Sequence, residues 1–418
     1  MPDDESTTPE TPDTTPGPAA DPSPTVGAAP TIMTRKELRA QHARASRTRW
    51  YVLGLVALLV IGGVVAAVLA GGTSAAKKKA AAPKAATATT VPPVVATCPL
   101  TGTPAPGGVV PPRPALAAKI GNYTDDRPSA GLNQADVVFE EPVEGSYTRL
   151  VAVFQCQSAA LVGDLRSARE PDVAILSQLS DPIFVHAGGI TPVLNLLADA
   201  PIQDENILGG GMTSITIHPS GRYAPYATFT NTTPVWALVP SDTTPPAPIF
   251  TFSAAPPAGA VAGSGLTVHV PFSTEADVTW TWNPSTSSYL RSYSGIPDRL
   301  VDGSQTSAAN VVVMTVPTFI GPWVENSEGG HEVEVDATGT GPAVVLRDGA
   351  AITGTWSRAS LTKPAVLTAA DGSPITLRPG NTWVELAPQG IPVTTTAAPV
   401  PAATTTAPAH STTPTTGT

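Results

Sequence analysis

Hydrophobic positions along this chain fall into one long uninterrupted run followed by many short runs. Residues 51–70 form twenty consecutive positions without a charged side chain. An α-helix rises about 1.5 Å per residue, so a helix of this length spans the ~30 Å hydrocarbon core of a bilayer. The pattern therefore predicts a single transmembrane helix over residues 51–70.

The charges on either side of this run predict its orientation. Six Lys and Arg residues lie directly before it, whereas the four lysines after it begin at Lys77. Cytoplasmic flanks carry the excess of Lys and Arg, and Trp50 and Tyr51 suit a membrane interface. We expect a cytoplasmic N-terminus and an extracytoplasmic body. The alternatives are a buried core helix and a cleaved signal peptide, but the apolar region of a signal peptide is shorter and lies nearer the start of a chain.

The first part of the body mixes strand and helix patterns. Short runs rich in Val, Leu and Phe predict strands at residues 116–120, 136–140, 149–156 and 183–186. Segments with an early proline and helically spaced apolar residues predict helices at residues 170–179 and 191–200. Strands that alternate with helices are typical of a layered domain. We therefore expect an α/β or α+β first ectodomain.

The second part of the body has a different pattern of apolar residues. From residue 266 onward, short runs rich in Val, Thr and Trp recur with turns between them, as in LTVHV, DVTWTW, NVVVMTV, HEVEVD and AVVLRDG. Such runs predict β-strands. The expected fold is thus a first domain of α/β or α+β class followed by a mainly β second domain, both after one N-terminal transmembrane helix.

Composition sets the expected boundaries. Segments poor in apolar residues and rich in Pro, Thr, Ala or one sign of charge cannot offset the entropy of ordering. We expect a disordered cytoplasmic tail with a basic juxtamembrane segment (1–50), the span (51–70) and an Ala/Pro/Thr linker (71–97). The α/β domain (98–239), a connection (240–265), the β-rich domain (266–392) and a disordered Thr/Pro/Ala tail (393–418) follow.

Charge and cysteine content narrow the expected partners. Residues 98–392 hold 13 basic and 26 acidic side chains, a balance of −13 that argues against nucleic acid or anionic lipid as a partner. Cys98 and Cys156 are either a disulfide or two free thiols, since spacing alone does not decide between them. The histidines are scattered without ligand spacing, so we expect no metal and no cofactor.

Charged residues gather where one predicted strand ends and the next begins. Arginine side chains beside a helix N-terminus can bind a carboxylate or a phosphate, because several donors converge on one anion. A histidine followed by glycines ends another strand before a helix, where α/β sheets often bind ligands. The alternative is that the arginines pair with nearby glutamates and hold strands together. The candidate ligand-binding residues are Glu140, Glu144, Arg149, Arg166, Ser167, Arg169, His186, Gly188 and Gly189.

Several short runs match a known family in order. They include PLTG at 99–102, RSAR at 166–169, VHAGG at 185–189, NVVV at 310–313 and LRPG at 377–380. On these residues the chain resembles the YerB-like family of bacterial envelope lipoproteins, whose two-part domain has no established function. The resemblance implies a membrane-tethered body outside the cytoplasm and brings no catalytic assignment. Cys98 lies 28 residues beyond the predicted span, so a helix would replace the lipid anchor.

Two functions remain as expectations. The first is a non-enzymatic envelope protein that binds an anionic cell-wall fragment or a partner protein through the candidate residues. The second is a hydrolase of an envelope polymer, with Glu140 or Glu144 as acid or base and His186 assisting. Two carboxylates in one groove would favour the hydrolase, and an isolated ion-paired set would disfavour it. A third, purely structural interpretation predicts no concave site.

Overall fold

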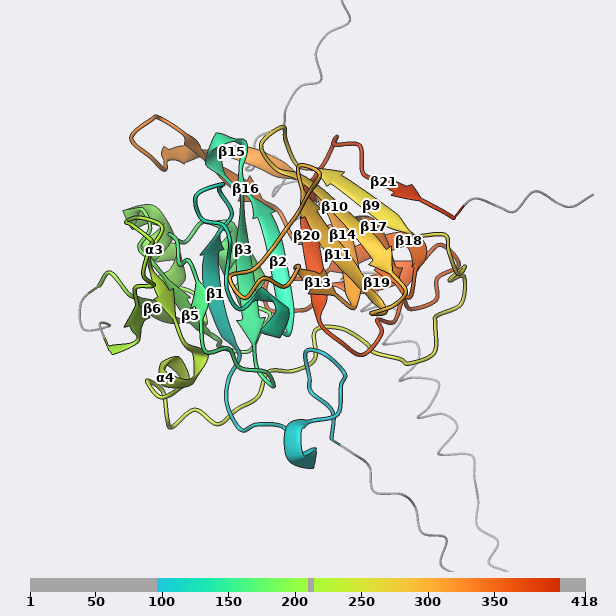
Figure 1. Ribbon diagram of the computed structural model, residues 1–418, viewed down its shortest axis with the longest axis horizontal. Helices are drawn as coiled ribbons and strands as arrows, with labels where there is room; N and C mark the ends of the chain where they lie inside the picture. The colour runs from blue at the N-terminus through green and yellow to red at the C-terminus, as the bar shows by residue number, and fades with distance from the viewer. Residues whose placement is uncertain (1–95, 210–213, 399–418) are drawn as a thin grey trace, which may run out of the picture. The chain divides into compact units, whose positions relative to one another are not determined.

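A mixed ten-stranded β-sheet runs through both halves of the body (Figure 1). The computed structural model describes residues 96–209 and 214–398. All of these residues belong to one compact unit. Across the sheet, the strands follow the order β19 (Val366–Ala369), β18 (Ala350–Arg358), β17 (Gly339–Arg347), β14 (Asn310–Val316), β20 (Thr382–Pro388), β2 (Val137–Pro142), β3 (Thr148–Phe154), β1 (Leu116–Gly121), β5 (Ile183–His186) and β6 (Gln203–Asn206).

The central strands are buried on both faces of the sheet. Every residue of β1, β2 and β3 is buried. Successive side chains of a strand point to opposite faces, so Leu116 and Ala118 join one apolar cluster while Ala117 joins the other. A strand covered on both sides has a nearly continuous apolar sequence, which explains the unbroken runs seen here.

The last long strand lies in the middle of the sheet. β20 pairs in parallel with β14 on one side and with β2 on the other, so it joins the two halves. β5 also runs parallel to β1 and to β6. The helical elements are short, and they are η1 (Pro106–Gly108), η2 (Leu132–Gln134), η3 (Glu144–Ser146), α2 (Pro171–Leu176), α3 (Thr191–Ala198) and α4 (Thr232–Trp236).

Three smaller sheets accompany the main one. A hairpin consists of β15 (Thr318–Val324) and β16 (His331–Val335) alone. A second sheet contains β12 (Ile296–Pro297), β11 (Ser288–Tyr293), β10 (Asp277–Asn283), β9 (Thr267–Pro271), β21 (Thr394–Thr396) and β13 (Ser307–Ala308). A third contains β4 (Val162–Gly163), β8 (Phe229–Thr230) and β7 (Thr216–Ile217).

The observed fold is mostly β with few helices, in two parts. Each strand and helix expected before residue 200 is present, although α2 and α3 end at residues 176 and 198. The expected α/β character of the first part is weak because these helices contain only 6 and 8 residues. The two parts share the ten-stranded sheet, while the expected boundaries at 239 and 266 stay predictions.

The ends of the body carry two further features. Cys98 and Cys156 form a disulfide that ties the entry segment to the end of β3. Residues 394–396, expected to belong to a disordered tail, form β21 against β9, as suits a run of β-branched threonines.

Part of the expected plan falls on residues that the structure does not describe. The predicted span at 51–70, the tail at 1–50, most of the linker at 71–97 and the tail beyond residue 398 all lie there. Within the described residues, 96–209 and 214–398, no helix has the length and apolar character needed to cross a bilayer.

Candidate functional site

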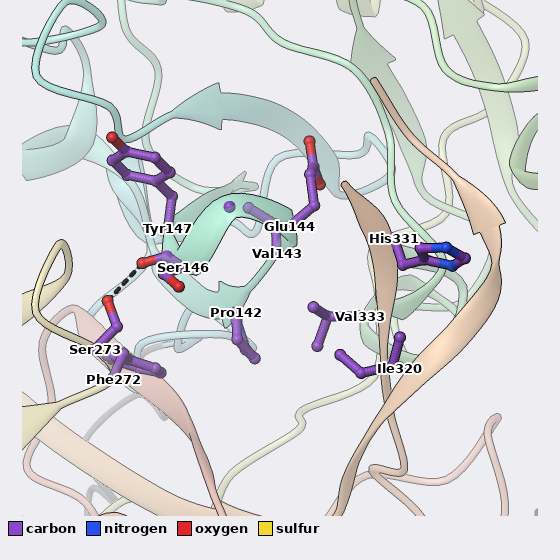
Figure 2. Close-up of a pocket in the computed structure, with 11 residues that line it drawn as sticks. Pro142, Val143, Glu144, Ser146, Tyr147, Phe272, Ser273, Ile320, His331 and Val333 are labelled. Atoms are coloured by element: carbon purple, nitrogen blue, oxygen red, sulfur yellow. Dashed lines mark hydrogen bonds between the residues drawn. The ribbon is translucent and has the colours of Figure 1, made fainter. Parts of the chain in front are cut away.

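A pocket of about 350 Å³ lies between the η3 turn and the β15–β16 hairpin (Figure 2). We call it the η3 pocket. Figure 2 shows Pro142, Ile320 and Val333 facing its interior, whereas the Glu144 side chain points away from Ile320 and Val333. The inner surface is therefore mainly apolar. Its lining comprises Pro142, Val143, Glu144, Gly145, Ser146, Tyr147, Phe272, Ser273, Ile320, His331 and Val333.

The η3 turn owes its shape to two residues in the left-handed region. Gly145 has φ +73° and Ser146 has φ +64°. Glycine adopts this conformation without steric cost, so Gly145 lets β2 reverse into β3 over a short connection. Ser273 then donates a hydrogen bond to the carbonyl of Ser146 and fixes the turn against the second half of the chain.

Behind the pocket, Glu144 meets two buried arginines. The Nε of Arg169 donates to Glu144 Oε2 at 2.8 Å, and another Arg169 nitrogen donates to Oε1. Arg149 approaches the same Oε1 at 3.4 Å. Arg169 also pairs with Glu325 at 3.2 Å, which lies directly after β15. We call these four residues the Glu144 cluster, and it ties the hairpin to the first half of the body.

Within the Glu144 cluster, Glu144 itself is held in its charged form. Burial alone would raise the pKa of Glu144, but the hydrogen bonds from Arg169 and the charge of Arg149 lower it to about 2. Burial raises the pKa of Glu325, and the charge of Arg169 opposes this shift. A carboxylate held this firmly by two guanidinium groups is a poor proton donor at neutral pH. Its arrangement suits a structural support of the pocket wall.

A second buried ionic group lies along the same strands. Lys119 donates to Glu141 and, at 2.7 Å, to Asp172 Oδ1. Asp172 Oδ2 accepts from the backbone N–H of Arg169 at 2.7 Å and so fixes the start of α2. Burial, with the charge of Asp172, raises the pKa of Glu141 to about 8. At neutral pH the Glu141 carboxyl group that faces Lys119 is therefore protonated.

Arg166 and Ser167 have other partners. Arg166 pairs with Asp126 at 2.5 Å instead of joining Arg149 and Arg169. The hydroxyl of Ser167 donates to the carbonyl of Ala187, and its own carbonyl accepts from Arg149. The RSAR segment therefore connects two clusters without presenting an uncompensated guanidinium group.

The histidine and glycines expected at the end of β5 form a tight local structure. Nε2 of the buried His186 lies 2.6 Å from Asp204 Oδ1, and Nδ1 lies 2.7 Å from the carbonyl of Gly188. Gly188 has φ +80°, and its carbonyl accepts from the backbone N–H of Ala168. Gly189 continues this turn into α3. None of the three residues lines the η3 pocket.

Glu140 belongs to a third buried network. Its Oε2 accepts from Arg291 at 2.7 Å, and its Oε1 accepts from Thr148 at 2.7 Å and from Asn122 at 3.1 Å. Arg291 also pairs with Asp298. These contacts leave Glu140 buried away from the η3 pocket, which disfavours it as the acid or base of a hydrolase.

The structure thus brings together Glu144, Arg149, Arg169 and Ser167 and separates the other candidates. Sequence reasoning missed the carboxylate partners because they come from distant segments. Asp126 lies in a loop, Glu325 lies in the connection between β15 and β16, and Asp204 lies on β6 beside β5. The one usable signal was the number of arginines in buried strands, since a buried charge requires a partner.

The protein is thus of a class with a two-part body built around one mixed sheet. Buried ionic clusters lie at the junction of the two parts. The chain belongs to the DUF3048 family of proteins of unknown function, whose N-terminal domain matches residues 100–244 and whose C-terminal domain matches residues 268–384. This finding confirms the two-part family suggested by the sequence runs.

Two comparisons point to one relative. The chain is 46% identical over 90 residues to YerB of Bacillus subtilis (strain 168), named as a candidate lipoprotein; the match covers 22% of this chain and 27% of that protein. The chain thus spans about a quarter of that relative's length. The crystal structure of the YerB protein from Bacillus subtilis matches with a TM-score of 0.60 and 23% identity, covering 70% of this chain and 96% of that one. At this identity the likeness shows the fold alone.

Proposed function

We propose that this protein is anchored in the cell membrane by one helix, lies outside the cytoplasm, and binds a partner polypeptide of the cell envelope at the η3 pocket. The location is supported by the uncharged run at 51–70 and its basic flank. The candidate-lipoprotein name of the YerB relative agrees with a membrane-tethered body.

The observation that carries the binding proposal is the apolar face of β15. Ile320 is 74% exposed and Val324 is 49% exposed, and Pro322 between them is exposed as well. Ile320 also lines the η3 pocket. Large aliphatic side chains beside an apolar hollow are typical of protein contact surfaces.

The form of β15 favours contact through side chains. Its register with β16 shifts between Ile320 and Val324, and Pro322 removes a backbone donor. Bulges and prolines on an edge strand block the addition of another strand. We infer that the partner inserts an apolar side chain into the η3 pocket instead of extending the hairpin.

An anionic cell-wall fragment, the other ligand expected from the sequence, has weaker support. Arg149 and Arg169 share Glu144, and Arg166 pairs with Asp126. An incoming anion would have to displace a buried carboxylate from each guanidinium group, which is costly. The hydrolase has weaker support still, because Glu140 is buried in another network and Glu144 stays ionised.

Site-specific photo-crosslinking in intact cells tests the proposal. A photoreactive amino acid replaces Ile320 in one variant and Ile296, which is 70% exposed on β12, in a matched control. We expect a discrete crosslinked species from position 320 and none from position 296. Identical products from both positions would reject the pocket as the binding site.

Protease treatment of the same cells tests the location separately. We expect added protease to remove the body when its access to the envelope is verified with a known surface protein. A fully protected body under those conditions would reject the extracytoplasmic location. Because the two readouts are independent, failure of one leaves the other interpretable.

A further inference from the structure

Four tyrosines and Arg166 form a series of side-chain contacts that begins with Tyr147 at the η3 pocket. The rings of Tyr147 and Tyr123 lie 4.2 Å apart between centroids. The guanidinium group of Arg166 lies 5.5 Å from the Tyr123 ring and 5.1 Å from the Tyr226 ring. The Tyr226 and Tyr223 rings are 5.8 Å apart. We call these four rings, with Arg166 at their centre, the tyrosine strip.

The tyrosine strip reaches solvent along its length. Tyr223 is 67% exposed, and the other three tyrosines are half-buried. Tyr289 and Tyr293 are buried, so the strip holds every solvent-accessible tyrosine in the described part of the chain. Tyrosine offers a flat apolar ring and a polar hydroxyl, which is the combination found at binding surfaces.

Hydrogen bonds from buried polar groups hold the centre of the strip in place. Asp126 Oδ1 accepts from Arg166, and Asp126 Oδ2 accepts from the backbone N–H of Tyr123 at 2.7 Å. Arg222 donates to the carbonyl of Asp126 at 3.0 Å and to that of Pro128. These bonds fix the Arg166 side chain, which is 16% exposed, between the two central rings.

A second carboxyl group, that of Asp164, lies close to Asp126. Both oxygens of Asp164 are buried. Burial, together with the charge of Asp126, raises the pKa of Asp164 to about 8. The Asp164 acid is therefore protonated at neutral pH.

We propose that the tyrosine strip binds an extended, neutral polysaccharide. Aromatic rings stack on the flat faces of sugar rings, and the phenol hydroxyls and the fixed guanidinium group of Arg166 can bond sugar hydroxyls. The body's balance of −13 repels polyanions such as nucleic acids and phosphate-rich polymers. A series of four neighbouring tyrosine rings suits a polymer of repeating units better than it suits a compact ligand. This surface adds a second, chemically different contact beside the η3 pocket.

Calorimetric titration of the full chain in detergent micelles tests the proposal. The probes are chitohexaose and cellohexaose, two neutral oligosaccharides, and deca-proline, an extended peptide. We expect a sugar to bind wild type and Tyr223→Ala or Tyr226→Ala to weaken binding about tenfold, which is ~1.4 kcal/mol. Tyr223→Phe keeps the ring and should bind within about twofold of wild type. Ile296→Ala, which alters an exposed side chain outside the strip, should leave binding unchanged.

Three results would overturn the proposal. The first is that neither sugar binds wild type at millimolar concentration. The second is that the alanine variants at 223 and 226 bind as well as wild type while retaining its thermal unfolding midpoint. The third is that deca-proline binds in a strip-dependent manner and the sugars do not, which would make the strip a polypeptide surface.

Discussion

Glu140 on β2 and Glu385 on β20 are direct register partners at the junction of the two halves of the sheet. Arg291 bonds Glu140, and Trp280 Nε1 donates to Glu385 Oε1 at 2.7 Å. Burial and the charge of Glu140 raise the pKa of Glu385 well above its usual range. Glu385 therefore acts as a neutral acid in the core, and the two glutamates have different roles.

This difference predicts unequal losses of stability for two isosteric variants. Glu140→Gln leaves the buried guanidinium group of Arg291 short of a charged partner and should lower the free energy of unfolding by about 3–5 kcal/mol. Glu385→Gln replaces a neutral acid by a neutral amide and should change it by less than about 1 kcal/mol at pH 7. Urea unfolding followed by tryptophan fluorescence measures both. Equal losses would contradict the assignment of a neutral Glu385.

The raised pKa of Asp164 predicts that the free energy of unfolding depends on pH. Its folded-state pKa of about 8 exceeds the unfolded value, so the folded state binds the extra proton between about pH 4 and 8. Its contribution to stability is thus greatest at acid pH and falls as pH rises through this window. Asp164→Asn should be more stabilising at pH 8.5 than at pH 5, by about 4 kcal/mol. Urea midpoints at both pH values test this, and a pH-independent difference would refute it.

Glu144 predicts the reverse dependence. Its pKa of about 2 lies below the unfolded value, so its contribution is present above about pH 4 and is lost as pH falls towards 2. Glu144→Gln should lower the free energy of unfolding by about 3 kcal/mol at pH 7, because Arg149 and Arg169 lose their shared carboxylate. Glu328→Gln on the same hairpin is the exposed control and should have no effect. An equal change in both variants would contradict a specific role for the Glu144 cluster.

The Cys98–Cys156 disulfide closes a segment with a sequence separation of 58. The double variant Cys98→Ser, Cys156→Ser should lose about 4 kcal/mol of stability in the chain-entropy description. Reductant should lower the thermal midpoint of wild type and leave that of the double variant unchanged. A wild type that keeps its midpoint after both thiols become titratable would show that the bridge contributes nothing.

The strands of the first half could be predicted because burial on both faces gives unbroken apolar runs. The run at 149–156 became β3, and the run at 183–186 became β5 with the same bounds. The order of the strands in the sheet could not be predicted, because the parallel neighbours β20 and β2 are about 240 residues apart in sequence. The two-residue strands β4, β7 and β8 carry too few residues to show any period.

The candidate site was predicted in part. Arginines and glutamates near the β2–β3 turn do meet, as the charge pattern indicated, and Glu144 contacts both Arg149 and Arg169. Arg166 was assigned to the same group, but it lies three residues before Arg169, so along an extended segment its side chain points to the opposite side, where it pairs with Asp126. The η3 pocket was not predicted from the sequence, because Ile320 and Val333 come from the hairpin of the other half of the chain.

The central position of β20 also constrains when the body can assemble. Residues 382–388 are synthesised after every other strand of the ten-stranded sheet, yet this segment fills the gap between β14 and β2. Until it arrives, two edges with unpaired backbone groups face each other and are open to wrong pairing. Folding of this chain therefore calls for either rapid completion of the sheet or a chaperone that shields those edges during the delay.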